Sequence, residues 1–394
     1  MTLTSRQRFL KVLNKEMPDR VPVTLFIQDQ GHFINQLYPQ VDPWDTLTNQ
    51  IKVIEFQREI GADVFVRLLF GLYEPIYWRF GGLNVDQENE NWEVHHEEVQ
   101  HNETRIRRST IRTPEGTLSQ EFSTYEVRPG TLLYACTKKP IHTPKDLKIA
   151  AKYEPGMAES FPVYVKDYVQ KIRTALGEDG IIGVWSPNGP FNTASRLIDE
   201  TNLYSLFLIE PDFYHELMEF SINRVITTTR AIDAAGIDVH IIGGNVAGGF
   251  LGKRNYDRHI LPYEKKYIDI VQENGTPAVY HNCGQIMNLI ESYKDLGVKW
   301  VEPFSPPPKL GDANLKKAKE VVDDAYVITG GVDQVLVIQQ GSVDDVRKAT
   351  EQTMRDGKPG GNFIIQNADF LEYDTPLKNV EAFVQTAIKH SAYD

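Results

Sequence analysis

Eight short, apolar, β-rich runs recur along the whole chain, and each ends in a polar or Gly/Pro-containing segment. Most of these runs are continuously apolar rather than alternating, which is typical of strands buried on both faces of a parallel sheet. The runs span residues 21–26, 63–68, 181–185, 239–245, 277–280, 298–303, 326–331 and 363–367.

Helical patterns lie between most of these runs. Residues 213–235, for example, place Phe213, Leu217 and Phe220 at helical spacing and end at Gly236. Eight β–α repeats predict an α/β fold, a (β/α)8 TIM barrel that occupies residues 1–394 as a single domain. A doubly wound open sheet is the alternative, although no Gly-x-Gly-x-x-Gly motif follows any run.

Residues 81–135 interrupt the repeat with alternating, turn-punctuated segments that are typical of antiparallel β-structure. We interpret this region as a β-hairpin insertion after strand two. Insertions at the carboxyl ends of barrel strands often form a rim or lid over the site. The alternative is a solvated hairpin that only caps the barrel.

The composition excludes several classes of protein. A net charge of −12 argues against a nucleic-acid or anionic-membrane surface, and no stretch approaches the roughly 20 apolar residues of a membrane span. With two cysteines in the sequence, we do not expect a disulfide framework. The polar, basic first 15 residues do not resemble a signal peptide, so we expect a cytoplasmic protein. Homo-oligomerisation stays open.

His281 and Cys283 follow directly on the fifth run. Two residues that are two positions apart at the end of a strand point the same way. Imidazole nitrogen and thiolate sulfur are ligands that zinc prefers. The alternatives are a buried structural cysteine and a histidine that is hydrogen-bonded in the core.

Other polar residues reach the same mouth, because the strands of a (β/α)8 barrel end at one face and active sites lie there. Three mixed ligands with an open fourth position would make a catalytic zinc site. Glu302 and Asp333 are candidate acid/base or substrate-orienting groups, although carboxylates at such turns also cap helices. The candidates for substrate binding at this mouth are Gln28, Arg67, Asn188 and Asn245. Asp369 follows the eighth strand and reaches the same mouth.

An aromatic stretch at residues 70–78, which includes Tyr73, follows the second run. Tyr73 is a candidate for lining an apolar substrate pocket. Core packing beneath the insertion explains the same residues equally well.

Several segments in this order resemble the uroporphyrinogen decarboxylase superfamily over nearly the whole length. They are Ser5-Arg6-Gln7-Arg8-Phe9, Pro18-Asp19-Arg20-Val21-Pro22-Val23, Leu261-Pro262-Tyr263, His281-Asn282-Cys283-Gly284, Gly330-Gly331-Val332-Asp333 and residues 374–380. The His-x-Cys-Gly element resembles the corrinoid-dependent methyltransferase branch. That resemblance implies a zinc site and a cobalamin carried by a partner corrinoid protein. The decarboxylases carry an arginine-rich segment after strand one, and residues 28–32 contain no arginine here.

The chain departs from this branch at one position. Alignment back from Asp374-Thr375-Pro376 places Asp369 where the family has its last zinc cysteine. The resemblance therefore implies the zinc ligands His281, Cys283 and Asp369. Because a carboxylate ligand hardens the metal, an oxygen substrate such as a methyl ether is favoured over a thiol. The alternatives are a methylcorrinoid:thiol methyltransferase, a metal-free decarboxylase and a non-catalytic binding subunit.

Overall fold

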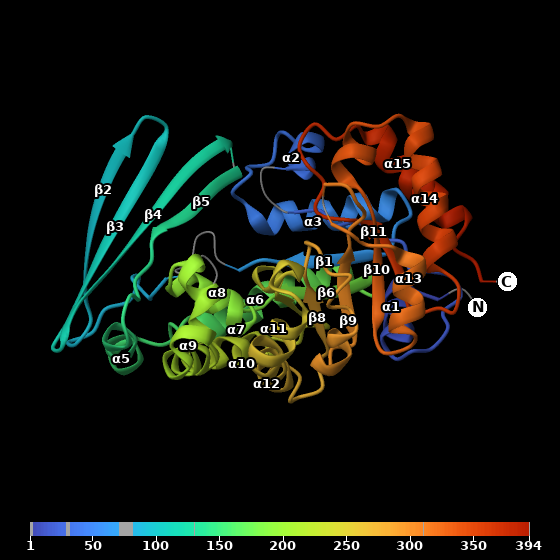
Figure 1. Cartoon of the computed structure of the whole chain (residues 1–394). Coiled ribbons are helices and arrows are strands. Elements are labelled where there is room, and N and C mark those ends of the chain that lie inside the picture. Colours follow the sequence, from blue (N-terminus) through green and yellow to red (C-terminus); the bar gives the residue numbers. More distant parts are fainter. Residues whose placement is uncertain (1–2, 29–31, 71–81, 130, 310, 394) are drawn as a thin grey trace.

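A seven-stranded parallel sheet forms the centre of the computed structural model, which describes residues 3–28, 32–70, 82–129, 131–309 and 311–393. Its strand order is β1-β6-β7-β8-β9-β10-β11, so strands that follow one another in this series are neighbours (Figure 1). This α/β arrangement is consistent with the predicted TIM-barrel-like fold. The strands are β1 (Val64–Leu68), β6 (Gly180–Trp185), β7 (Val239–Gly243), β8 (Ala278–His281), β9 (Trp300–Phe304), β10 (Val327–Val332) and β11 (Phe363–Asn367).

The first predicted strand, residues 21–26, is not a regular strand. It makes one parallel bridge, between Val23 and Ile365 of β11. On the other side the Val23 carbonyl accepts a hydrogen bond from the backbone of Asp63, but the Val23 N–H donates to the Asp63 carboxylate (2.8 Å). Pro22 has no N–H to donate. The segment therefore lies between the two edge strands without a full ladder.

The interior of the sheet is closed at its amino end by helix α1 (Ser5–Leu13). Phe9, Val12 and Leu13 of this helix pack in one apolar cluster with inward-facing residues of every strand of the sheet. Phe9 stacks on Trp300 with ring centroids 6.4 Å apart, and Phe65 lies 5.1 Å from Trp300. This end is filled with apolar side chains, which leaves the carboxyl end for polar groups.

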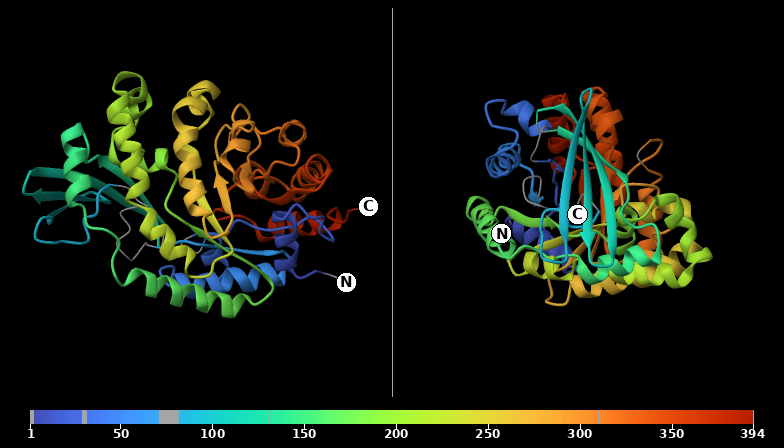
Figure 2. Two further views of the ribbon diagram at one scale, coloured as in Figure 1. Left: turned by 90° about the horizontal axis from the view of Figure 1, so that it is seen from below. Right: turned by 90° about the vertical axis from the view of Figure 1, so that its left-hand side faces the viewer.

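Helices surround the sheet (Figures 1 and 2). The predicted helix over 213–235 is two helices, α9 and α10, which are separated at Arg224 and Val225. The helices besides α1 are α2 (Phe33–Leu37), α3 (Thr46–Glu59), α5 (Pro144–Tyr153), α6 (Phe161–Leu176), α7 (Pro190–Leu197), α8 (Glu200–Ile209), α9 (Pro211–Asn223), α10 (Ile226–Asp233), α11 (Lys253–Asn255), α12 (Leu261–Val271), α13 (Leu315–Val322), α14 (Val343–Gly357) and α15 (Leu377–Lys389).

The inserted region forms a second, four-stranded antiparallel sheet on one side of the molecule, away from α14 and α15 (Figures 1 and 2). Its strands extend to Lys138, slightly beyond the predicted boundary. Arg128 reaches back to the segment after β11, with its guanidinium 4.5 Å from the centre of the Tyr373 ring. The strands are β2 (Glu93–His101), β3 (Thr104–Thr113), β4 (Gly116–Arg128) and β5 (Thr131–Lys138).

Among the described residues, no helix has both the length and the apolar character required to cross a membrane.

A candidate metal centre at the carboxyl ends of the strands

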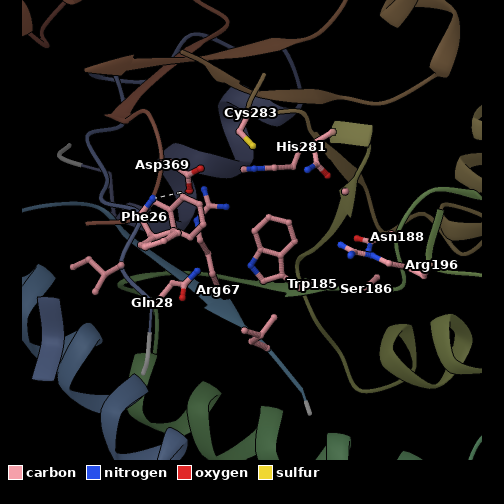
Figure 3. Close-up of a pocket in the computed structure, with 15 residues that line it drawn as sticks. Phe26, Gln28, Arg67, Trp185, Ser186, Asn188, Arg196, His281, Cys283 and Asp369 are labelled. Atoms are coloured by element: carbon pink, nitrogen blue, oxygen red, sulfur yellow. Dashed lines mark hydrogen bonds between the residues drawn. The ribbon is translucent and has the colours of Figure 1, made fainter. Parts of the chain in front are cut away.

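A cavity of about 240 Å3 opens at the carboxyl end of the parallel sheet. Its described walls come from the segment before α2, from the ends of five strands and from α7 (Figure 3). No described residue of the inserted sheet lines it, so in this part of the chain the insertion is not a lid over the cavity. The lining residues are Phe26, Ile27, Gln28, Arg67, Leu69, Trp185, Ser186, Asn188, Arg196, Gly243, Asn245, His281, Cys283, Asp369 and Phe370.

Three potential metal ligands converge in this cavity. His281 is the last residue of β8, Cys283 follows two positions later, and Asp369 lies two residues beyond β11. Their ligand atoms all lie within 4.8 Å of one another. One imidazole, one thiol and one carboxylate from two strands are thus brought together, as zinc requires of a three-residue site.

Asp369 is positioned by backbone contacts around it. Its own N–H donates to the side-chain oxygen of Gln334 (3.1 Å), and its Oδ1 accepts from the backbone of Phe370 (2.8 Å). Burial raises the pKa of its carboxyl group, and the nearby charge of His281 opposes that rise. A cation between these groups would favour the ionised carboxylate in the same way.

Glu302 lies behind His281 rather than in the cavity wall. It is fully buried, and its Oε1 is 3.1 Å from His281 Nδ1. Arg67 grips the same carboxylate with both terminal nitrogens, at 2.6 and 2.7 Å. Burial alone would raise the pKa of Glu302, but Arg67 and then His281 outweigh it and lower that pKa to about 2.

The Glu302 contact also determines how His281 can bind a metal. Since Nδ1 faces the carboxylate, Nε2 is the nitrogen left for a ligand bond, which is the usual carboxylate–histidine–metal arrangement. In the metal-free chain, burial alone would lower the pKa of His281. Interactions with Cys283 and Glu302 outweigh burial and raise that pKa to about 10. The proton held there is one that a zinc ion would displace. The donor set and its second layer therefore fit zinc.

Aromatic side chains form the apolar wall beside the metal ligands. Trp185 meets His281 edge to face, with ring centroids 4.8 Å apart, and Phe26 meets it similarly at 6.2 Å. Phe370 lies against Phe26 at 6.1 Å. These rings exclude water from one side of the cavity and offer flat apolar surface to a small substrate.

The opposite side is polar. Asn188 and Arg196 lie together there, away from Phe26 and Asp369, with Trp185 between the two groups in the view (Figure 3). Asn245 also lines the cavity, and its Oδ1 accepts from Asn192 (2.7 Å). Gly243 is needed beside this wall, because a Cβ there would stand 2.5 Å from the Asn188 side-chain oxygen.

The structure brings seven of the sequence candidates to the cavity wall and places two others behind or beside it. Asp333 caps the turn at Gln334–Gln339 by accepting from the backbone of Val335 (2.8 Å) and Leu336 (2.7 Å). Its position matches the alternative role of a helix cap. Tyr73 lies outside the described residues. The candidates that line the cavity are Gln28, Arg67, Asn188, Asn245, His281, Cys283 and Asp369.

Sequence reasoning missed several wall residues. Phe26, Trp185 and Ser186 stand at the ends of predicted strands, so the strand-end rule could have found them. Ser186 is already engaged, with its Oγ 2.7 Å from His240 Nδ1. Arg196 lies in the last turn of helix α7, where no strand-end signal exists.

The comparisons with known proteins agree with this geometry. The model of the family described as Uroporphyrinogen decarboxylase (URO-D) matches residues 125–390, more than half of the chain. Methylcobamide:CoM methyltransferase MtbA of Methanosarcina mazei is 27% identical over 200 residues, and uroporphyrinogen decarboxylase of Carboxydothermus hydrogenoformans is 24% identical over 260. These matches cover 50% and 63% of this chain and 56% and 69% of those relatives. The chain thus spans little more than half the length of the first of them.

A solved structure described as a methyltransferase from Methanosarcina mazei superposes with a TM-score of 0.69 at 19% identity. The superposition covers 98% of this chain and 99% of that one. At this level of identity the likeness shows a shared fold.

Proposed function

Since the chain belongs to the uroporphyrinogen decarboxylase family, we propose that it is a corrinoid-dependent, zinc-dependent methyltransferase. It would move a methyl group between a small molecule and the cobalt of a separate corrinoid protein. The convergence of His281, Cys283 and Asp369, with ligand atoms within 4.8 Å of one another, is the observation that carries this proposal. Two relatives are named methylcobamide:CoM methyltransferases, which supports the same reaction class.

The cavity argues against decarboxylation of a tetrapyrrole. Its volume of about 240 Å3 lies below the roughly 300–1,000 Å3 of typical drug-sized ligand sites. Arg67, one of the two arginines in the described wall, is already neutralised by Glu302. A porphyrinogen with many carboxylates would find too little room and too little positive charge.

We propose an O-methyl compound as the methyl donor. When bound, zinc would supply Lewis acidity at the ether oxygen. The cobalt(I) of the partner corrinoid supplies the electron pair of the new methyl–cobalt bond and becomes cobalt(III), while the methyl–oxygen bond breaks with its electron pair left on the oxygen. The alkoxide or phenoxide takes a proton from solvent when it leaves the cavity. In this scheme Glu302 and Arg67 hold His281 in place, and Trp185 and Phe26 exclude water from the reacting oxygen.

A spectroscopic assay tests the proposal directly. The purified chain is incubated with a cobalt(I) corrinoid and a panel of methoxylated and thiol compounds, and methylation of cobalt is followed in the cobalamin spectrum. We expect the wild-type chain to methylate cobalt with one or more of the methyl ethers. Asp369→Ala should lose both this activity and its bound zinc. Full zinc occupancy and full activity in Asp369→Ala would remove Asp369 from the ligand set.

A second candidate is a methylcorrinoid:thiol methyltransferase, in which a thiol accepts the methyl group from cobalt. The match to methylcobamide:CoM methyltransferases favours it. The two candidates differ at Asp369, because a third soft ligand suits a thiol and a carboxylate suits an oxygen substrate. If the first candidate is right, Asp369→Cys should lower ether demethylation and increase thiol methylation. If the second candidate is right, the wild type has no ether demethylation to lose, and the variant should only increase thiol methylation.

A further inference from the structure

The cavity contains two arginines in its described wall, and they are in opposite electrostatic states. Arg67 makes a forked salt bridge with Glu302, so its charge is cancelled inside the protein. Arg196 makes no salt bridge with any carboxylate of the described residues. Its Nε is buried and has no hydrogen-bond partner within that same part of the chain. Because Arg196 lines the cavity without a carboxylate partner from the described protein, its guanidinium is available to an anionic ligand.

Arg196 is held at the wall by the helix that carries it. It lies in the last turn of α7, where its immediate neighbours Ser195 and Leu197 are buried and anchor the turn. Its side chain and that of Asn188 occupy the side of the cavity away from Asp369 (Figure 3). A cation in the last turn also interacts favourably with the helix carbonyls, but that interaction leaves the buried Nε unsatisfied.

Among the described residues of the cavity wall, the charges sum to a single positive charge once a zinc ion is bound. A zinc ion would be neutralised by the Cys283 thiolate and the Asp369 carboxylate, and Arg67 is neutralised by Glu302. What remains is the guanidinium of Arg196. Its positive charge is also felt outside the cavity wall, since it adds to burial in lowering the pKa of Lys139. A substrate with one negative charge would balance the site.

We propose that Arg196, assisted by Asn188, binds a carboxylate of the substrate at the side of the cavity away from Asp369. A planar guanidinium is matched to a carboxylate by two parallel hydrogen bonds. The ring of Trp185 lies between that wall and Asp369 in the view of Figure 3, and Phe26 packs against Trp185 from the Asp369 side. The substrate class is therefore a small aromatic acid whose methoxy group lies across the ring from the carboxylate. The position of the methoxy group rests on the proposed function, whereas recognition of the carboxylate does not.

Binding measurements separate this inference from the methyltransferase proposal. We would titrate the zinc-loaded protein with 4-methoxybenzoate and with its neutral counterpart 4-methoxybenzamide by calorimetry. Hydrogen bonds to charged groups lead us to expect roughly 10–100-fold tighter binding of the acid. Arg196→Gln should abolish that preference, Arg196→Lys should keep part of it, and Arg112→Gln, an exposed arginine of the inserted sheet, should leave it unchanged. Thermal unfolding of each variant checks that it folds.

The outcomes are distinct. Equal binding of acid and amide by the wild-type protein, or a preference that survives Arg196→Gln, would overturn the inference. If the acid preference depends on Arg196 but no corrinoid is methylated, the proposed function fails and the anion site stands. If methoxybenzene and methoxybenzoate are demethylated with equal kcat/KM, methyl transfer stands and the anion site fails. We expect Arg196→Gln to raise KM for the acid and to change kcat little.

Discussion

The two ends of the parallel sheet each bury an arginine–carboxylate pair, but they use it differently. At the amino end, Asp63 is enclosed by Ser5, Arg8, Arg20 and the backbone of Val23, so both of its oxygens are occupied. At the carboxyl end, Glu302 is shared between Arg67 and His281, and His281 faces the cavity.

This difference separates a structural pair from a positioning pair. The amino end is filled by Phe9 and its neighbours, which form one buried apolar cluster with the strands. At the carboxyl end the same kind of pair leaves His281 with one free nitrogen beside Cys283 and Asp369. A buried ion pair that is only structural contributes little specificity, whereas one that orients a ligand determines metal affinity.

We expect the largest effect from replacing a candidate metal ligand at the carboxyl end of the sheet. Without such an effect, the two ends of the sheet would not differ in function. Cys283→Ser removes the single soft donor, so we expect loss of stoichiometric zinc and at least about a thousandfold loss of methyl transfer, or ~4 kcal/mol. Cys136→Ser, the matched change in the inserted sheet, should leave both unchanged. Metal analysis and the cobalamin assay measure the two outcomes. Retention of zinc by Cys283→Ser would contradict the account.

Neutralising either buried acid should lower the stability of the protein by a similar amount. Asp63→Asn and Glu302→Gln each leave a buried arginine without its full counter-charge, and each should lower the free energy of unfolding by about 3–5 kcal/mol. Denaturant unfolding of the metal-free proteins measures this. A large cost for Asp63→Asn but none for Glu302→Gln would mean that the second pair is solvated and not equivalent to the first.

The same two variants should differ in metal binding. Glu302→Gln weakens the contact that orients His281, so zinc affinity should fall by about 10–100-fold. Asp63→Asn is at the other end of the sheet and should bind zinc as the wild type does. Competition with a chromogenic chelator measures both affinities. Equal affinities would assign Glu302 a structural role only.

Taken per pH unit, the smallest predicted effect is the pH dependence of zinc binding. The pKa of His281 is raised to about 10 in the metal-free chain, so the imidazole carries a proton at neutral pH that zinc must displace. Apparent zinc affinity should therefore rise with pH, by about tenfold per unit between pH 7 and 9, as this proton is lost. Calorimetry in buffers of different ionisation enthalpy should detect its release. A flat profile would show that His281 is not the ligand.

Most of the fold follows from sequence pattern, because continuous apolar runs report strands that are buried on both faces. Seven of the eight predicted strands are present. The run at 21–26 is apolar in the same way, but Pro22 has no N–H to donate and the carboxylate of Asp63 replaces a backbone acceptor for the Val23 N–H. Such a substitution of side chain for backbone is invisible to hydropathy.

The convergence of the three candidate metal ligands was predictable for a related reason, since residues at strand ends share one face of the sheet. Pairing across the sheet was not. Glu302 and Arg67 are 235 positions apart, and their salt bridge depends on which strands face one another across the interior. Arg196 was missed because its helix position gives no sign that the side chain reaches the cavity.

X-ray absorption at the zinc edge of the purified protein tests the central claim most directly. The account predicts one zinc per chain, with one sulfur neighbour at about 2.3 Å and nitrogen and oxygen neighbours at about 2.0–2.2 Å. The sulfur signal should vanish in Cys283→Ser and persist in Cys136→Ser. Substoichiometric zinc in the wild-type protein, or a zinc site without sulfur, would contradict it.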